Sequence, residues 1–323
     1  DVVLDLKGHS LLAEDGHDTD EEMGTTYTNV EGENISIENV ANVKGEGKGQ
    51  SLGMKVTGTK AKDGSTVPGS IRFHATGDAD ITLFGEAASD ATSIEAGNTA
   101  ITNRGKLSDG SYQAKEALHV YNAKGGTISG GTFKGADTTL TNEADLSGAK
   151  IEGTETLTVK NAASIQNATF TGGAVAVDNH GKGSVMKDVT LTGSAITLTN
   201  EETVSHTAET GAMTVTNRGK LSSGKYTAKA GTMGITNEGT IENGTFTARG
   251  DLTYTDSENA SLSGSDFTSE EGNVKVTARG QLALKKLSAK KSATVDADRD
   301  VTLTEAEAGT LAISSGGSVN AGT

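Results

Sequence analysis

The sequence predicts an all-β chain that folds as a right-handed parallel β-helix, a β-solenoid of stacked coils. Three observations favour this class: asparagines recur at a nearly constant interval, apolar residues recur in step with them, and apolar and polar residues alternate within each repeat. The steps between the asparagines are 19, 20, 19, 18, 21, 17 and 20 residues, which is too short for a self-sufficient domain. We therefore expect about 19–20 residues per coil, and roughly sixteen coils in the whole chain. The asparagines are Asn103, Asn122, Asn142, Asn161, Asn179, Asn200, Asn217 and Asn237.

Residues 1–95 form the less regular coils of the predicted solenoid. Three charged or glycine-rich excursions, at 14–22, 44–51 and 60–69, interrupt them. Insertions in a solenoid project from one face, so a specific recognition patch is expected in these excursions first. Short runs of alternating apolar residues predict strands at 3–6, 35–43, 52–56, 71–73 and 81–83.

Residues 96–323 carry the regular 19-residue repeat, in which three apolar columns predict three short strands per coil. Glycine, and Asn-Gly or Ser-Gly pairs, supply the positive backbone angles that the corners between strands need. The first column contains Ile101, Val120, Leu140, Val159, Val177, Leu198, Val215, Ile235, Tyr254, Val276, Val295 and Ile313. The second column contains Leu107, Ile128, Leu146, Ile165, Val185, Val204, Leu221, Ile241, Leu262, Leu282, Val301 and Val319.

The third column is rich in aromatic residues. Each of its rings stands between polar neighbours, so the alternation predicts that the rings point inward and stack in the core. An exposed row of rings would instead form a platform for sugars. The predicted core rings are Tyr112, Phe133, Phe170, Tyr226, Phe246 and Phe267. The same column also contains Ile151, Leu191 and Leu287, with a gap near His206.

The recurring asparagines mark one corner of each coil. An inward asparagine at a corner can bond the backbone of neighbouring coils and stack with its equivalents into an amide ladder. We therefore expect the eight side chains to fix the bend of the chain. A column of side-chain carbonyl oxygens that holds cations is the alternative.

Composition limits the functions that the chain can serve. The formal charge of −15 repels phosphate backbones and no basic stripe offsets it, so no nucleic-acid partner is expected. No apolar run approaches ~20 residues, so no membrane-spanning helix is predicted. Cysteine is absent, which removes disulfides and thiolate metal sites, and no cofactor is predicted.

Neither end resembles a capping unit, so we expect one continuous solenoid that is a fragment of a longer chain.

Two acidic clusters are candidates for chemistry. The excursion at 14–22 surrounds His17 with carboxylates, but it lacks the ordered spacing of a calcium loop, so a solvated loop is expected. The six histidines show no metal-triad spacing, and no metal site is predicted. Alternation would place Asp296, Asp298 and Asp300 on one outward face beside Arg299, the kind of surface on which coil-shaped pectin-degrading enzymes act. Soluble strands also need outward charges, so no catalytic residue is predicted.

The unit Ile-Thr-Asn-x-Gly-x-Leu-Ser-x-Gly-x-Tyr-x-Ala resembles the repeats of filamentous-haemagglutinin-type proteins. The Asn-x-Gly corner is intact at Asn103, Asn217 and Asn237, whereas the repeats at Asn142 and Asn161 lack the glycine. Proteins of this type are the long secreted partners of two-partner (type V) secretion, and they include adhesins and contact-dependent growth-inhibition sticks. The opening of this chain also resembles the first strand of autotransporter passengers.

The resemblance implies a segment of a large exported bacterial surface adhesin, secreted or held at the cell surface. Such a segment would act as a rigid shaft that presents a binding region to an unidentified ligand on a host cell, in the matrix or on another bacterium. One alternative is a self-assembling extracellular filament or matrix protein that associates end to end. A second alternative is a polysaccharide lyase or hydrolase built on a β-helix. We expect no enzymatic activity.

Overall fold

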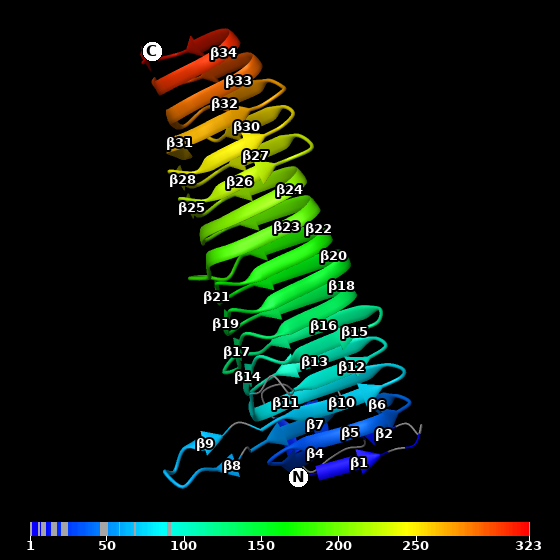
Figure 1. Ribbon diagram of the computed structural model, residues 1–323. Helices are drawn as coiled ribbons and strands as arrows, with labels where there is room; N and C mark the ends of the chain where they lie inside the picture. Colours follow the sequence, from blue (N-terminus) through cyan, green and yellow to red (C-terminus); the bar gives the residue numbers. More distant parts are fainter. Residues whose placement is uncertain are drawn as a thin grey trace. The chain divides into compact units, whose positions relative to one another are not determined.

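The computed structural model describes residues 2–5, 7, 11–13, 18–20, 25–45, 51–57, 59–67, 69–88 and 92–322. Within these ranges every regular element is a β-strand, and the strands form stacked coils, a β-solenoid of about 13 turns (Figure 1). The predicted all-β class with a parallel, coil-stacked sheet is confirmed. The chain divides into two compact units, Asp1–Val159 (unit 1) and Lys160–Thr323 (unit 2).

The strands are short where glycine corners separate them and long where one strand continues around a corner. Unit 1 contains β1 (Val2–Asp5), β2 (Leu11–Ala13), β3 (Asp18–Asp20), β4 (Thr25–Gly32), β5 (Ile35–Val40), β6 (Val43–Gly45), β7 (Ser51–Val56), β8 (Thr59–Lys60), β9 (Thr66–Val67), β10 (Ile71–Ala75), β11 (Ala79–Ala88), β12 (Ser93–Ala96), β13 (Thr99–Asn103), β14 (Lys106–Ser108), β15 (Ser111–Ala114), β16 (Ala117–Asn122), β17 (Thr127–Ser129), β18 (Thr132–Asn142) and β19 (Asp145–Ser147). The boundary between the units lies in β20 (Lys150–Asn161). Unit 2 contains β21 (Ser164–Gln166), β22 (Thr169–Asn179), β23 (Val185–Asn200), β24 (Thr203–Asn217), β25 (Lys220–Ser222), β26 (Lys225–Ala228), β27 (Met233–Asn237), β28 (Thr240–Glu242), β29 (Thr245–Ala248), β30 (Leu252–Asp256), β31 (Ser261–Ser269), β32 (Val274–Ala278), β33 (Gln281–Ala297), β34 (Val301–Ser315) and β35 (Val319–Ala321).

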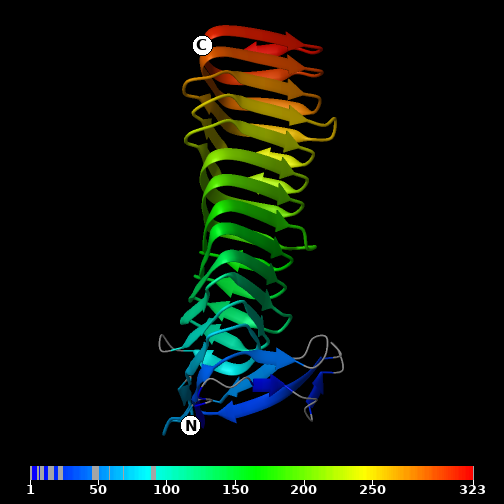
Figure 2. The same ribbon diagram turned by 90° about the vertical axis from the view of Figure 1, so that its right-hand side faces the viewer.

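From β11 onward, three parallel sheets form the sides of the coils, and Figure 2 shows the strands of successive coils lying side by side. We call them face A, which contains Ile101, face B, which contains Leu107, and face C, which contains Tyr112. On face A, Ile101 pairs with Val120, and on face C, Tyr112 pairs with Phe133. Residues about one repeat apart therefore lie side by side, and the inward side chains of the three faces form the core.

The apolar columns of unit 2 follow the predicted register with one exception. On face B, Ile165 pairs with Met186, whereas the sequence pattern assigns Val185 to this place. Met186 is buried and Val185 is only half-buried. The two apolar residues are adjacent, so the pattern fits either one, and the turn after Asn179 is longer than the turn after Asn161, which moves the inward position by one residue. On face A the pairing runs through Val177, Leu198, Val215, Ile235, Tyr254, Val276, Val295 and Ile313.

The gap in the third column is filled by a small residue. Ala208 pairs with Leu191 on one side and with Tyr226 on the other, and it is buried. The coil that contains Ala208 is also the shortest, and its pairing with β23 skips Asp188, which is an extra residue in the longer coil. The skipped residue accounts for one of the four residues by which this coil is shorter than the coil before it, and the other three lie in the turn before Val185, which pairs with Thr203.

The corner between faces B and C needs a left-handed backbone conformation. In most coils one residue has φ between 50° and 83° there, a region that residues other than glycine, asparagine and aspartate rarely adopt. This requirement explains why glycine, asparagine and aspartate dominate the corner. The residues are Asp109, Gly130 and Gly148 in unit 1, and Asn167, Asp188, Ser223, Asn243 and Gly264 in unit 2.

The glycine two residues before a core ring makes room for that ring. A Cβ atom on Gly224 would lie 2.5 Å from Cε2 of Tyr226, and a Cβ atom on Gly244 would lie 2.6 Å from Cε2 of Phe246. Both distances are far below van der Waals contact. At these two positions the glycine of the Gly-x-aromatic pattern is therefore a packing requirement, whereas Ala168 and Ser265 stand before Phe170 and Phe267.

The first coils stack on faces A and C, and they are longer than the sequence suggests. On face C, Ile35 pairs with Ile71, so corresponding residues lie 36 positions apart, as in the bond between Asn34 and Ser70. The excursions add residues to these coils without adding strands to the faces. This is why the chain makes about 13 turns rather than roughly sixteen.

Two of the predicted loops contain short strands. Within the excursion at 60–69, β8 and β9 form an antiparallel hairpin (Figure 1). Within the excursion at 14–22, β3 pairs antiparallel with β4. The structure does not describe residues 14–17, 21–22, 46–50 and Pro68. His17, the histidine of the acidic excursion, is among them.

Candidate functional site

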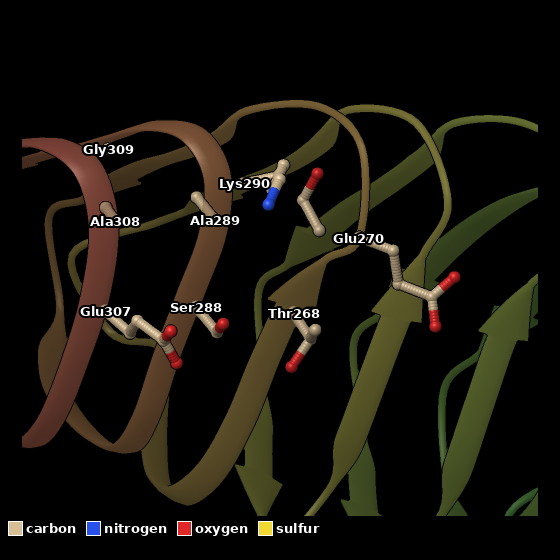
Figure 3. A pocket seen from close by; sticks show the side chains of 9 residues that line it. Thr268, Glu270, Ser288, Ala289, Lys290, Glu307, Ala308 and Gly309 are labelled. Carbon is tan, nitrogen blue, oxygen red and sulfur yellow. The ribbon is translucent and has the colours of Figure 1, made fainter.

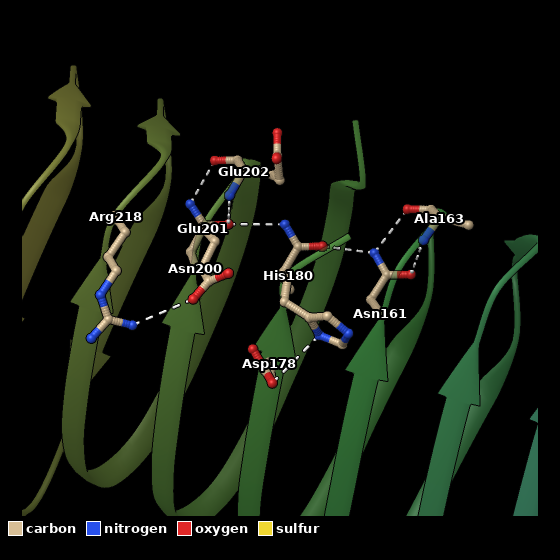
Figure 4. A network of polar contacts seen from close by, with 9 residues as sticks. Asn161, Ala163, Asp178, His180, Asn200, Glu201, Glu202 and Arg218 are labelled. Carbon is tan, nitrogen blue, oxygen red and sulfur yellow. Dashed lines mark hydrogen bonds and ion pairs between the residues drawn. The ribbon is translucent and has the colours of Figure 1, made fainter. Parts of the chain in front are cut away.

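The eight predicted asparagines are fully buried and bond to one another within each unit. In unit 1, Nδ2 of Asn103 donates to Oδ1 of Asn122 at 2.8 Å, and Asn122 donates to Asn142 at 2.8 Å. In unit 2, the same bond links each member from Asn161 to Asn237 at 2.7–2.9 Å (Figure 4). In these bonds the amide donates toward the next coil, so each unit contains a polar row of aligned hydrogen bonds.

Each asparagine also closes its own corner. In Figure 4, Asn200 accepts the backbone N–H of Glu202 at 3.3 Å and donates to the Glu202 carbonyl at 2.7 Å. The Asn200 oxygen additionally accepts the amide of Asn179, so both of its lone pairs are used. An oxygen in this state is not directed at a cation, and the geometry favours the amide ladder over the cation alternative at this corner.

The row in unit 2 ends on a buried acid. Nδ2 of Asn237 donates to the Tyr254 hydroxyl at 3.1 Å, and this hydroxyl donates to Asp256 at 3.0 Å. Asp256 also accepts the backbone N–H groups of Arg279 and Gly280. A carboxylate only accepts, so it is suited to terminate a series of donors whose dipoles point toward it. The sequence pattern alone did not reveal this end of the ladder.

The six predicted core rings are buried, so the face C column forms no exposed platform. Tyr112 and Phe133 stack with centroids 4.4 Å apart, and Tyr226 and Phe246 stack at 4.7 Å. The next contact, between Phe246 and Phe267, is edge-to-face at 5.4 Å. The remaining ring, Phe170, lies in register with an aliphatic side chain, Leu191.

The predicted acidic cluster does not assemble on one strand face. Strand β33 ends at Ala297, so Asp298 and Asp300 lie in the following bend rather than in alternation with Asp296. Asp298 forms an ion pair with Arg279 at 3.4 Å, and Asp300 accepts the backbone N–H of Ser318 at 2.7 Å. Among the described residues, no group of three or more His, Asp or Glu side chains is placed to hold a metal ion.

Two shallow hollows lie on the outer surface, where corners carry small residues. In unit 2, a hollow of about 340 Å³ lies beside Thr268, Ser288 and Glu307, which come from successive coils (Figure 3). In unit 1, a hollow of about 350 Å³ lies over the glycine corner between Asp109 and Lys150. The repeat pattern predicted neither hollow, because both depend on which small residues stack at a corner.

One surface cluster of unit 1 escaped the sequence analysis. The Tyr121 hydroxyl donates to Oε2 of Glu143 at 2.8 Å across one coil. Partial burial and Glu143 raise the pKa of Tyr121, while the charge of Arg104 lowers it, which places Arg104 in the same electrostatic environment. Alternation could have shown that Tyr121 points outward, because it stands between the inward residues Val120 and Asn122.

Comparisons of the chain with known protein families, curated proteins and solved structures find no match. The chain is a β-solenoid repeat protein. No helix long and apolar enough to cross a membrane occurs in the part of the chain that the structure describes.

Asp80 in β11 gives the stability of unit 1 a predicted pH dependence. Burial raises the pKa of Asp80 from 3.8 to about 6. The unfolded chain therefore loses this proton first as pH rises, so the free energy of unfolding falls between about pH 4 and pH 6 and stays lowered above that. We expect Asp80→Asn to stabilise the protein at pH 7.5 by about 1–2 kcal/mol, a value discounted for partial exposure. Thermal unfolding at pH 3.5 should show no such gain, and an equal gain at both pH values would contradict this assignment.

Proposed function

We propose that this chain is a stiff shaft segment of an exported bacterial surface adhesin, which holds a binding region away from the cell. The observation that supports the proposal best is the buried amide ladder. Its asparagines bond to the coils before and after them and to their own corners. The hydrogen-bonding groups of their side chains therefore serve to join coils. The repeat resemblance supplies the bacterial surface setting.

The backbone adds to the resistance expected of a shaft. Strands β23 and β24 pair in parallel along all three faces, from Val185–Thr203 to Asn200–Asn217. Separating two such coils along the stacking direction would break these bonds and the amide bond between Asn200 and Asn217 nearly together. Stiffness therefore follows from the same contacts that define the fold.

Pulling on single molecules, held at the two ends of the chain, tests the mechanical part. We expect unfolding in steps that correspond to whole coils, about 70 Å of released chain for a coil of ~20 residues. A variant that lacks residues 218–237 joins Asn217 to Glu238 and removes one coil in register. It should keep the fold and the unfolding force, and lose one step.

The matched control removes residues 218–227, about half a coil, and should lose the cooperative fold because inward and corner residues no longer superpose. Smooth extension of the parent chain at low force would contradict the shaft proposal. Failure of the one-coil deletion to fold would contradict the proposal as well. Antibody labelling of intact producing cells tests the surface location, and a signal confined to the cytoplasm would refute it.

A further inference from the structure

Among the aromatic side chains that the structure describes, Tyr121 is the one that the core does not contain. The chain has 11 aromatic residues, and the structure describes the side chains of nine of them. Eight of these nine are buried, while Tyr121 is half-exposed on the outer side of face A in unit 1. A ring that stays partly exposed gives up part of the burial that stabilises the other eight, so its position calls for an explanation other than packing.

The neighbours of Tyr121 give its ring room above the sheet. Its partners in the adjacent coils are Thr102 and Thr141, whose side chains are much shorter than that of tyrosine. At the next corner, Arg104 and Glu143 belong to the coils on either side, with the small Ala123 between them. The exposed part of the ring therefore has a cation in the coil before it and a carboxylate in the coil after it.

These groups match the chemistry of a sugar. One face of a pyranose ring presents C–H groups that pack on an aromatic ring, while its edge presents hydroxyls. The guanidinium of Arg104 can donate to these hydroxyls and the carboxylate of Glu143 can accept from them. We propose that Tyr121, Arg104 and Glu143 form a subsite for one pyranose ring of a glycan, a binding role that does not depend on the shaft function.

A protein partner fits the same surface less well. A stable protein interface covers about 800 Å² on each side and usually centres on several buried apolar or aromatic anchors. The exposed large apolar side chains of the described residues are Val3, Leu4, Val67, Leu311 and Val319, and none of them pairs with the strand that carries Tyr121. A single ring with charged flanks suits a small polar ligand.

The test uses the whole chain and a panel of oligosaccharides that end in glucose, galactose, mannose, N-acetylhexosamine or sialic acid. Saturation-transfer NMR should detect contact between protein and sugar, and titration should give dissociation constants. Tyr121→Thr removes the ring but matches the threonines of both neighbouring coils, so the fold should persist. We expect it to weaken binding at least tenfold, Glu143→Gln to weaken it several-fold, and Tyr121→Phe to retain most of it.

Thr216→Ala, an outward substitution on face A of unit 2, is the matched control and should bind as the parent does. Thermal unfolding of each variant separates loss of binding from loss of structure. The proposal is overturned if no sugar in the panel binds, or if a sugar binds equally to the parent and to Tyr121→Thr. Neither result would bear on the pulling experiment, so the two proposals fail separately.

Discussion

Replacing Asn217 with alanine is expected to lower the free energy of unfolding by about 2–4 kcal/mol. The substitution deletes a donor to Asn237 at 2.8 Å and to the Thr240 carbonyl at 3.1 Å, and it deletes the acceptor for Asn200 at 2.9 Å. Asn200 and Asn237 remain buried and the Thr240 carbonyl partly buried, so water does not fully replace the lost bonds. Asn200 keeps its bond to Glu202, which limits the loss.

Chemical unfolding of the full chain measures this effect, and hydrogen exchange should locate it in the coils around Asn217. The control is Thr216→Ala, an adjacent half-exposed position, which should change stability by no more than about 0.5 kcal/mol. Asn217→Asp keeps the size but cannot donate when ionised, so its penalty should shrink as pH falls and the carboxyl becomes protonated. Equal stability of Asn217→Ala and Thr216→Ala would contradict a stabilising ladder.

Phe246→Ala is expected to cost about 3–5 kcal/mol, because it removes a fully buried ring from the narrow core. The ring stacks on Tyr226 at 4.7 Å and meets Phe267 edge-on at 5.4 Å, so both contacts disappear. Parallel backbone bonds hold the coils at a fixed spacing, and they prevent the neighbours from closing the void. The same unfolding measurement gives the magnitude.

Two further variants test that explanation. Phe246→Leu should cost less than about 1.5 kcal/mol, since leucine occupies the same column at Leu191 and Leu287. Thr247→Ala changes the outward neighbour and should be nearly neutral. A small loss for Phe246→Ala would show that the coils can move together and that the core is less rigid than the backbone pairing implies.

The pairing of distant residues could be predicted where corners have constant length. Leu221 pairs with Ile241, as the spacing of the repeat required, and the same holds along most of the three columns. The prediction failed at Met186, where one corner differs in length, and in the first coils, where Ile35 pairs with Ile71. Alternation shows which side chains point inward within a strand. A loop of unknown path changes which residues of the next coil lie beside them, and the alternation does not record that change.

The candidate sites divide in the same way. The asparagine row and the aromatic column recur once per coil, so a periodic sequence reveals them. The acid that ends the row at Asp256 occurs once, and so does the cluster of Arg104, Tyr121 and Glu143, which draws on three coils. A feature that occurs once leaves no period in the sequence and is found only from positions in space.

The sequence by itself determined the class of fold, the three-sided coil and the inward identity of its core residues. These follow from two periods, the alternation along a strand and the repeat of about 19 residues, because stacking is the arrangement that buries every column at once. The tertiary structure alone decided how many turns the chain makes, where the amide row ends and which surface groups meet. Those properties depend on the exact length of each corner and on side chains from neighbouring coils, and close packing fixes both only when the coils are stacked.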